Sequence, residues 1–315
     1  MNRIGLMLGL AGAVFVGLKI YAYGDQTPFR SITAFGFASM AGLAIVYGAS
    51  NALLAMAWKN LLLALKSPVK TWWAIWAYGM SQIAKYIPGN ICQFLGRQTI
   101  GLAAGLPGWV LVKSTAAELV LGAVCGATFA ILVLPLSKFP VAISISALVF
   151  SAAIIVLIVL ARMFWNTYIA IAVLCYLVFL AVSGLIFSGA LAIVHGGFNA
   201  WLPTIVGSYV VAWLAGFLTP GAPAGIGVRE AVLLFLFEQT ADGPAILLAI
   251  IIARMITMAG DFLNFGCCYA YSSLVDRSWT AHTSDKLIAT EKSLSHKTSK
   301  DEQSVTCSQA QELRP

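Results

Sequence analysis

Charged residues are scarce in this chain. Asp, Glu, Lys and Arg make up 10% of its 315 residues, whereas about 25% is usual for a soluble domain. Hydrophobic residues reach 60%, and the mean hydropathy is +0.89. This shortage of charge excludes a soluble globular domain and predicts an all-α, polytopic helical membrane protein.

The residue patterns of metal sites and of most enzymes are also missing. The sequence has three histidines and six cysteines, and the cysteines fall mostly within apolar segments without metal-ligand or disulfide spacing. It has no paired nucleophile and base and no glycine-rich nucleotide loop. We therefore expect no metal, no cofactor and no catalytic residue, and an intramembrane enzyme is the least favoured function.

The excess of basic residues does not point to nucleic acid. The net charge is +7, but Lys and Arg are scattered between apolar segments and form no groove-sized cluster with interleaved aromatics. Membrane proteins gather basic residues in their cytoplasmic loops, which explains the excess better. We expect a membrane lipid as the partner, and no nucleic acid.

Six apolar runs are long enough to cross a bilayer, which takes about 20 residues. They are Ile4–Tyr23, Ser31–Trp58, Val110–Leu134, Val141–Ala161, Thr167–Val194 and Ala245–Tyr271. A cleaved signal peptide is the alternative for the first run, but Lys19 interrupts its end and no clear small-x-small cleavage site follows. We therefore expect six full spans.

Two further apolar stretches are interrupted by proline and glycine. One runs from Trp72 to Pro107 and is broken at Pro88 and Gly89, and the other runs from Trp201 to Glu238. Irregular backbone at membrane depth must be buried in protein or line a water-filled cavity. We expect two broken or re-entrant hairpins, although a stretch of about 35 residues is also long enough for two full spans.

The order of these elements repeats along the chain. A span, a hairpin and a span run from Ser31 to Leu134, and the same order runs from Thr167 to Tyr271 with the opposite sidedness. Inverted repeats whose broken helices meet near the midplane are a transporter architecture. The sequence therefore predicts an inverted repeat around a polar site.

The distribution of basic residues predicts the orientation of the chain. With a cytoplasmic N-terminus, the inner side receives 11 basic residues, six of them in the polar tail, and the outer side receives two, Arg30 and Lys138. This bias predicts a multi-pass protein of the bacterial plasma membrane with both termini in the cytoplasm. We expect an integral membrane domain over residues 1–274 and a disordered polar cytoplasmic tail over residues 275–315.

Eight charged residues lie within the core segments. The basic ones are Lys85, Arg97, Lys113, Arg229 and Arg254, and the acidic ones are Glu118, Glu230 and Asp261. A charge at a helix centre costs about 2.5 to 3.5 kcal/mol, so we expect these residues to be paired or to face a cavity. A phosphate or diphosphate head group would neutralise the basic surplus of two.

Arg229 and Glu230 open a short helix after a glycine-rich break. The free N–H groups and the positive dipole end of such a helix favour an anion. Gly225 and Gly227 allow the backbone to approach a ligand closely. The alternative is that Arg229 and Glu230 pair with opposite charges only to hold helices together.

Four other charged residues complete the predicted site. Arg254 and Asp261 are seven residues apart, about two helical turns, so they lie on nearly the same face and can line one side of a cavity. Lys85 and Arg97 flank the break in the first hairpin. Their alternative role is to extend along apolar surface to the membrane interface.

Three sequence elements carry a resemblance to a known family. They are Lys85-Tyr86-Ile87-Pro88-Gly89-Asn90 with Gly96-Arg97, Pro220-Gly221 through Gly225-Ile226-Gly227-Val228-Arg229-Glu230-Ala231, and Arg254 with Gly260-Asp261. In their order and spacing, the chain from Ile4 to Tyr271 resembles the membrane region of the lysylphosphatidylglycerol synthase family. The G-x-G-x-R-E element is the most specific of the three.

The resemblance implies an integral membrane protein that handles lipids. In two-domain members, the corresponding region is associated with moving aminoacylated phospholipid between leaflets, and stand-alone members include relatives linked to polyprenyl-phosphate glycan pathways. The two-domain members continue into a large soluble transferase domain, whereas a polar segment follows Tyr271 here. Lysyl transfer is therefore not expected. The residues 222–224 are Ala-Pro-Ala where the family suggests more glycine, which leaves the geometry of that loop open.

Two functions follow from these observations. In the first, the protein is a flippase- or scramblase-like translocator for a phospholipid or a polyprenyl-phosphate-linked lipid. The residues that bind the phosphate head group are then Arg229, Arg254, Lys85 and Arg97, supported by Glu230, Asp261, Pro88, Gly89, Gly225 and Gly227. In the second, the protein moves nothing and serves as the membrane partner of a separate synthase or glycosyltransferase.

Overall fold

The computed structural model of the chain describes residues 33–86, 91–136, 141–195, 201–219, 225, 227–237 and 244–272. The chain divides into two compact units, Met1–Cys268 and Tyr269–Pro315, and the described helices lie in the first unit apart from residues 269–272. No strand occurs among the described residues, so the predicted all-α fold is confirmed. The predicted first span, the break at Pro88 and Gly89, and the predicted tail lie outside the described residues.

Five described helices are long and apolar enough to cross a membrane. They are α2 (Ala34–Ala64), α5 (Gly108–Thr128) with its 3-10 continuation η4 (Phe129–Leu136), α6 (Ile143–Phe164), α7 (Thr167–His195) and a last helix, Pro244–Ser272. Each covers one of the predicted apolar runs. Five of the six predicted spans are therefore confirmed, and the protein has the helices of a multi-pass membrane protein.

Polar side chains and glycine set several helix ends. The Thr33 hydroxyl accepts a hydrogen bond from the Gly36 N–H at 3.2 Å, and the Asn166 side chain accepts one from the Ile169 N–H at 2.9 Å. These contacts satisfy N–H groups that have no partner within the first turn of α2 and of α7. The helix that contains Arg97 ends where Gly105 adopts a φ of 83°, a left-handed conformation that stops a helix.

Shorter helices form the two interrupted stretches. The first consists of α3 (Thr71–Gln82), η3 (Ile83–Tyr86) and α4 (Cys92–Ala103), and the second of α8 (Leu202–Leu218) and α9 (Val228–Phe237). At 1.5 Å per residue, α3, α4 and α9, with 10 to 12 residues, rise about 15 to 18 Å, well short of the roughly 30 Å hydrocarbon core, whereas α8, with 17 residues, rises about 26 Å. This favours re-entrant hairpins over pairs of full spans.

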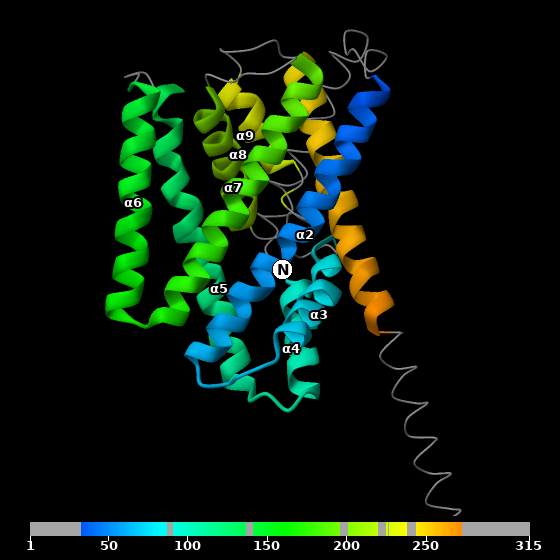
Figure 1. The fold of residues 1–315 in the computed structure, drawn as a ribbon, viewed down its shortest axis with the longest axis vertical. Helices are drawn as coiled ribbons and strands as arrows, with labels where there is room; N and C mark the ends of the chain where they lie inside the picture. Colours follow the sequence, from blue (N-terminus) through cyan, green and yellow to red (C-terminus); the bar gives the residue numbers. More distant parts are fainter. Residues whose placement is uncertain are drawn as a thin grey trace, which may run out of the picture. The chain divides into compact units, whose positions relative to one another are not determined.

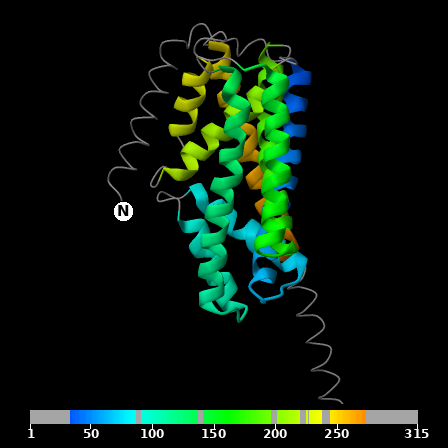
Figure 2. The ribbon, with the colours of Figure 1, turned by 90° about the vertical axis from the view of Figure 1, so that its left-hand side faces the viewer.

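The two hairpins lie toward opposite ends of the helix bundle. Figures 1 and 2 show α3 and α4 in the lower half, at the end where α2 finishes, and α8 and α9 in the upper half, at the end where α7 finishes. The long helices α2 and α7 pack along each other between them. This arrangement matches the predicted order of span, hairpin and span in two opposite directions.

A close backbone contact joins α2 to the last helix. A Cβ atom placed on Gly260 would lie 2.6 Å from the Ala44 carbonyl oxygen and 2.9 Å from the Gly48 nitrogen. Likewise, a Cβ on Gly48 would lie 2.8 Å from the Gly260 carbonyl oxygen. Only glycine allows the two helices to approach this closely, as is common for small residues at helix interfaces in membranes.

Replacement of Gly260 by alanine is expected to lower the free energy of unfolding by about 1 to 3 kcal/mol, because the added methyl group meets main-chain atoms that have to move. Gly266→Ala is the matched control, since no atom lies within 4 Å of the added Cβ at that position of the same helix. Unfolding in mixed micelles with increasing SDS measures the free energy of unfolding of both variants. Equal stability of the two variants would show that the contact is not tight.

Candidate functional site

A cavity of about 900 Å³, counted with its opening, lies among the helices. Both hairpins contribute to its wall, with Lys85 from η3 and Arg229 from α9, and α2, α5, α7, α8 and the last helix contribute further residues.

Asp261 on the last helix anchors one side of the cavity. Its Oδ2 atom lies 2.7 Å from the Lys85 Nζ and accepts a hydrogen bond from the Tyr86 hydroxyl at 2.6 Å. Its Oδ1 atom accepts a hydrogen bond from the Asn51 amide at 3.2 Å. Through this one carboxylate, α2 and the first hairpin are joined to the last helix.

Glu230 belongs to the second hairpin and is used in two contacts. Its Oε1 atom lies 2.7 Å from the Arg254 Nε, and its Oε2 atom accepts a hydrogen bond from the Gly227 N–H at 2.6 Å. The carboxylate therefore caps the start of its own helix and pairs with a cation on the last helix. Part of the free N–H capacity predicted at this helix start is thus already satisfied within the chain.

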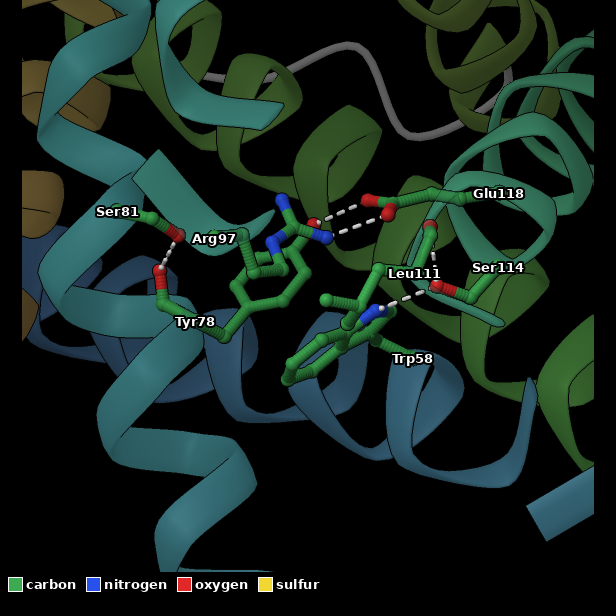
Figure 3. Close-up of polar contacts among 7 residues, drawn as sticks. All are labelled: Trp58, Tyr78, Ser81, Arg97, Leu111, Ser114 and Glu118. Atoms are coloured by element: carbon green, nitrogen blue, oxygen red, sulfur yellow. Dashed lines mark hydrogen bonds and ion pairs between the residues drawn. The ribbon is translucent and has the colours of Figure 1, made fainter. Parts of the chain in front are cut away.

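Arg97 and Glu118 form a third ion pair, deep in the first half of the protein (Figure 3). The Arg97 guanidinium is only 2% exposed and lies 3.8 Å from the centre of the Tyr78 ring. The Tyr78 hydroxyl donates to the Glu118 Oε1 at 2.9 Å. Beneath them, the Trp58 indole N–H donates to Ser114 at 3.2 Å. Arg97 therefore does not extend to the membrane interface.

Arg229 is the exception among these cations. It is 6% exposed, lies in the cavity wall, and its guanidinium carbon is 4.2 Å from the centre of the Tyr209 ring. Within the described part of the chain, no carboxylate lies close enough to form an ion pair with it. A buried cation without an anionic partner is costly, so an anion beside Arg229 would stabilise this position.

The charge balance of the site differs from the prediction by one. Lys113 is exposed on α5 and lies against the Trp109 ring, so it does not belong to the buried set. The remaining described core charges are four basic and three acidic side chains, and each acidic one is paired. The predicted surplus of two is therefore wrong, because apolarity of a segment does not tell which helix face a charge occupies. Among the described core charges the surplus is one, at Arg229.

The two hairpins repeat one contact. In the first, Tyr78 of α3 lies under Arg97 of α4, and in the second, Tyr209 of α8 lies under Arg229 of α9. The difference is the anion, since Glu118 pairs with Arg97 and no described carboxylate pairs with Arg229. The Arg97–Glu118 pair shows that a carboxylate fits beside a guanidinium that stacks on tyrosine.

The structure brings most of the predicted site together. Arg229, Arg254, Lys85 and Asp261 all line the cavity, so Arg254 and Asp261 do share one face. Arg97 is paired beneath the wall and is not among the lining residues.

The two predicted glycines at the start of α9 are described. Gly225 and Gly227 have φ values of 70° and 89°, which glycine adopts readily. Gly225 packs against Gly216, where an added Cβ would lie 3.0 Å from the Gly225 Cα. Gly225 lines the cavity as well.

Sequence reasoning missed the tyrosines and the amide that hold the charged residues. Tyr86 and Asn51 bind Asp261, and Tyr209 stacks on Arg229. Tyr86 was recoverable, because it directly follows Lys85 in the broken stretch. A lone tyrosine or asparagine within an apolar run carries no comparable signal.

Comparison with known proteins assigns the chain to no family. No family model matches the chain, and no curated protein is significantly similar to it. The described residues contain no group of three or more His, Cys, Asp or Glu side chains that could hold a metal ion. The site is thus defined by its cations, its tyrosines and its cavity.

Proposed function

We propose that the protein is a lipid translocator, flippase- or scramblase-like, for a phospholipid or a polyprenyl-phosphate-linked lipid. The lipid phosphate binds Arg229 in the cavity between the two hairpins. Arg254 and Lys85 add positive potential at the same cavity, although each is itself paired with a carboxylate.

The proposal rests mainly on the burial and the charge pairing of Arg229. Three of the four core cations are neutralised by carboxylates of the chain, and Arg229 is buried without one among the described residues. Guanidinium groups bind phosphate through two parallel charge-assisted hydrogen bonds. A lipid phosphate would supply the missing charge without leaving the membrane.

The hairpin arrangement supports movement of the lipid between leaflets. The hairpins approach from opposite ends of the bundle, and both contribute to the wall of one cavity. In transporters with inverted repeats, alternate opening of two such halves exposes a central site to each side in turn. The motifs around Lys85, Arg229 and Arg254, which resemble a lipid-handling family, support the same function.

The proposed location is the bacterial plasma membrane, with both termini in the cytoplasm. The excess of Lys and Arg on one side supports this orientation. The first hairpin then enters from the cytoplasm and the second from the opposite side.

Arg229→Gln is expected to slow lipid translocation about tenfold or more, because a charge-assisted contact contributes about 1.5 to 3 kcal/mol and 1.4 kcal/mol is a factor of ten. The assay follows fluorescent phosphatidylglycerol and fluorescent polyprenyl phosphate in liposomes with reconstituted protein, using a membrane-impermeant quencher. Lys113→Gln is the matched control, since it removes a cation that is exposed and away from the cavity.

Equal rates for wild type and a folded Arg229→Gln variant would refute the role of Arg229. If wild-type protein moves neither lipid faster than protein-free liposomes, the proposal of a translocator for these lipids fails. The role of membrane partner for a separate synthase or glycosyltransferase would then be the better account.

A further inference from the structure

Three neutral polar side chains line the cavity, and two of them have buried polar atoms without a hydrogen-bond partner among the described residues. Gln82 at the end of α3 is 7% exposed, Gln93 at the start of α4 is 9% exposed, and Tyr176 on α7 is 4% exposed. The Gln82 side-chain oxygen and the Tyr176 hydroxyl are buried without a hydrogen-bond partner among the described residues. Gln93 lines the same cavity. Leaving such groups unpaired costs about 1 to 3 kcal/mol each, so their convergence on one cavity indicates a polar occupant.

Several buried serines of the core are satisfied within their own helices. Ser50, Ser81 and Ser183 donate to main-chain carbonyls of their own helices at 2.7 to 2.9 Å. Other described side chains also have buried unpartnered polar atoms but do not line the cavity, namely those of Asn51, Trp76, Arg97, Thr204 and Ser208. The three cavity groups differ from both sets because they come from three elements and face the same space.

The side chains of Gln82, Gln93 and Tyr176 can form hydrogen bonds with the hydroxyl groups of a ligand. A glutamine amide offers a donor and an acceptor, and a tyrosine hydroxyl offers both, so together they complement a group that also donates and accepts. A polyol such as glycerol or a sugar has this property.

The carboxylates of the cavity disfavour an amine head group. Glu118 and Asp261 are the acidic residues among those that line it. Glu118 already binds Tyr78 and Arg97, and Asp261 is held by three donors. An ammonium group entering the cavity would find no free anionic partner among the described residues.

The net charge of the site also indicates which type of phosphate group it can bind. With one uncompensated cation, Arg229, the described core balances a single negative charge. A phosphodiester carries one such charge, whereas a diphosphate carries more. The site therefore matches a phosphodiester better than the diphosphate that the sequence alone left open.

We infer that the cavity binds the head group of a phosphodiester lipid bearing a neutral polyol, with the phosphate at Arg229 and the hydroxyls at Gln82, Gln93 and Tyr176. This inference rests on the proposed phosphate site and narrows its substrate class. Lipids with a glycerol or sugar head group qualify, and lipids with an amine head group do not.

A competition between matched lipids tests this inference. Full-length protein in detergent is given equal amounts of phosphatidylglycerol, phosphatidylmethanol and phosphatidylethanolamine with the same acyl chains, and native mass spectrometry measures which lipids are retained. Phosphatidylglycerol and phosphatidylmethanol carry the same charge, and only the former has hydroxyls. We expect about tenfold preference for phosphatidylglycerol over phosphatidylmethanol, the effect of one or two hydrogen bonds, and least retention of phosphatidylethanolamine.

Two variants separate the polyol contacts from the phosphate site. Gln82→Met with Gln93→Met removes both amides at similar side-chain size, and it should bind the two anionic lipids equally while still preferring them to phosphatidylethanolamine. Arg229→Gln should lose the preference for anionic lipids. Thermal unfolding of each variant establishes that it is folded.

The outcomes distinguish the inference from the function on which it rests. Equal retention of phosphatidylglycerol and phosphatidylmethanol by wild type, with both lost in Arg229→Gln, would overturn the polyol and leave the phosphate site standing. Preferential retention of phosphatidylethanolamine would overturn the polyol as well. Retention of anionic lipids that Arg229→Gln does not change would overturn both. Displacement of phosphatidylglycerol by soluble glycerol 3-phosphate at equal concentration would assign the site to a water-soluble ester and overturn the lipid substrate.

Discussion

Replacement of Glu118 by glutamine is expected to lower the free energy of unfolding by about 3 to 5 kcal/mol, the usual effect of removing one partner of a buried ion pair. The reason is that Arg97, which is almost completely buried, would keep its charge without an anion. Glutamine has nearly the shape of glutamate and its amide oxygen can still accept the Tyr78 hydroxyl. The loss therefore reports the charge and not a cavity.

SDS unfolding of a double variant tests this explanation. Arg97→Met combined with Glu118→Gln removes both charges, so most of the lost stability should return. Lys113→Gln on the same helix as Glu118 should change stability little, since its cation is exposed. A Glu118→Gln variant as stable as wild type, or a double variant no more stable than the single one, would show that the pair does not hold the fold.

Asp261→Asn is expected to cost about 3 kcal/mol for the same reason, because Lys85 would lose its carboxylate. The expected loss lies at the lower end of the usual range because Lys85 borders the cavity, where water can reach it. Asparagine keeps one acceptor oxygen, so it can preserve either the Tyr86 contact to Oδ2 or the Asn51 contact to Oδ1 in its present direction, and the loss includes a hydrogen bond besides the charge.

The consequence for the first hairpin can be measured separately. Lys85 and Tyr86 are the contacts by which η3 is tied to the last helix through Asp261. In Asp261→Asn we therefore expect amide hydrogen exchange in α3 and η3 to be faster than in the wild type. Exchange in α6, which lies away from this contact, should not change. Adding Lys85→Met should restore part of the stability. Unchanged exchange in the hairpin would contradict its attachment through Asp261.

Much of the fold follows from local sequence. Long apolar runs predict α2, α5, α6, α7 and the last helix because a bilayer admits only segments that satisfy their own backbone. The interrupted stretches around Lys85 and Arg229 predict the hairpins, since proline and glycine end helices at places where a full span needs to continue. The short α3, α4 and α9 favour re-entrant hairpins over two spans, and exact helix ends cannot be predicted from apolarity.

The pairing of the charges could not be predicted. Sequence identifies Lys85 and Asp261 as charges in apolar segments, but they are far apart in the chain and meet only through the packing of the hairpin on the last helix. For the same reason, Arg97 was assigned to the lipid site although Glu118 neutralises it. Gln82 and Gln93 gave no signal, because a neutral amide near a helix end is common and only the cavity gives it meaning.

The most direct test of the central claim is an experimental structure of wild-type protein in nanodiscs made with a total bacterial lipid extract. We expect a lipid phosphate whose oxygens lie about 2.7 to 2.9 Å from the Arg229 guanidinium, the distance of a charge-assisted hydrogen bond, with the acyl chains leaving the cavity toward the membrane. An Arg229 paired with a carboxylate of the protein itself, in a cavity that holds no lipid head group, would contradict the claim.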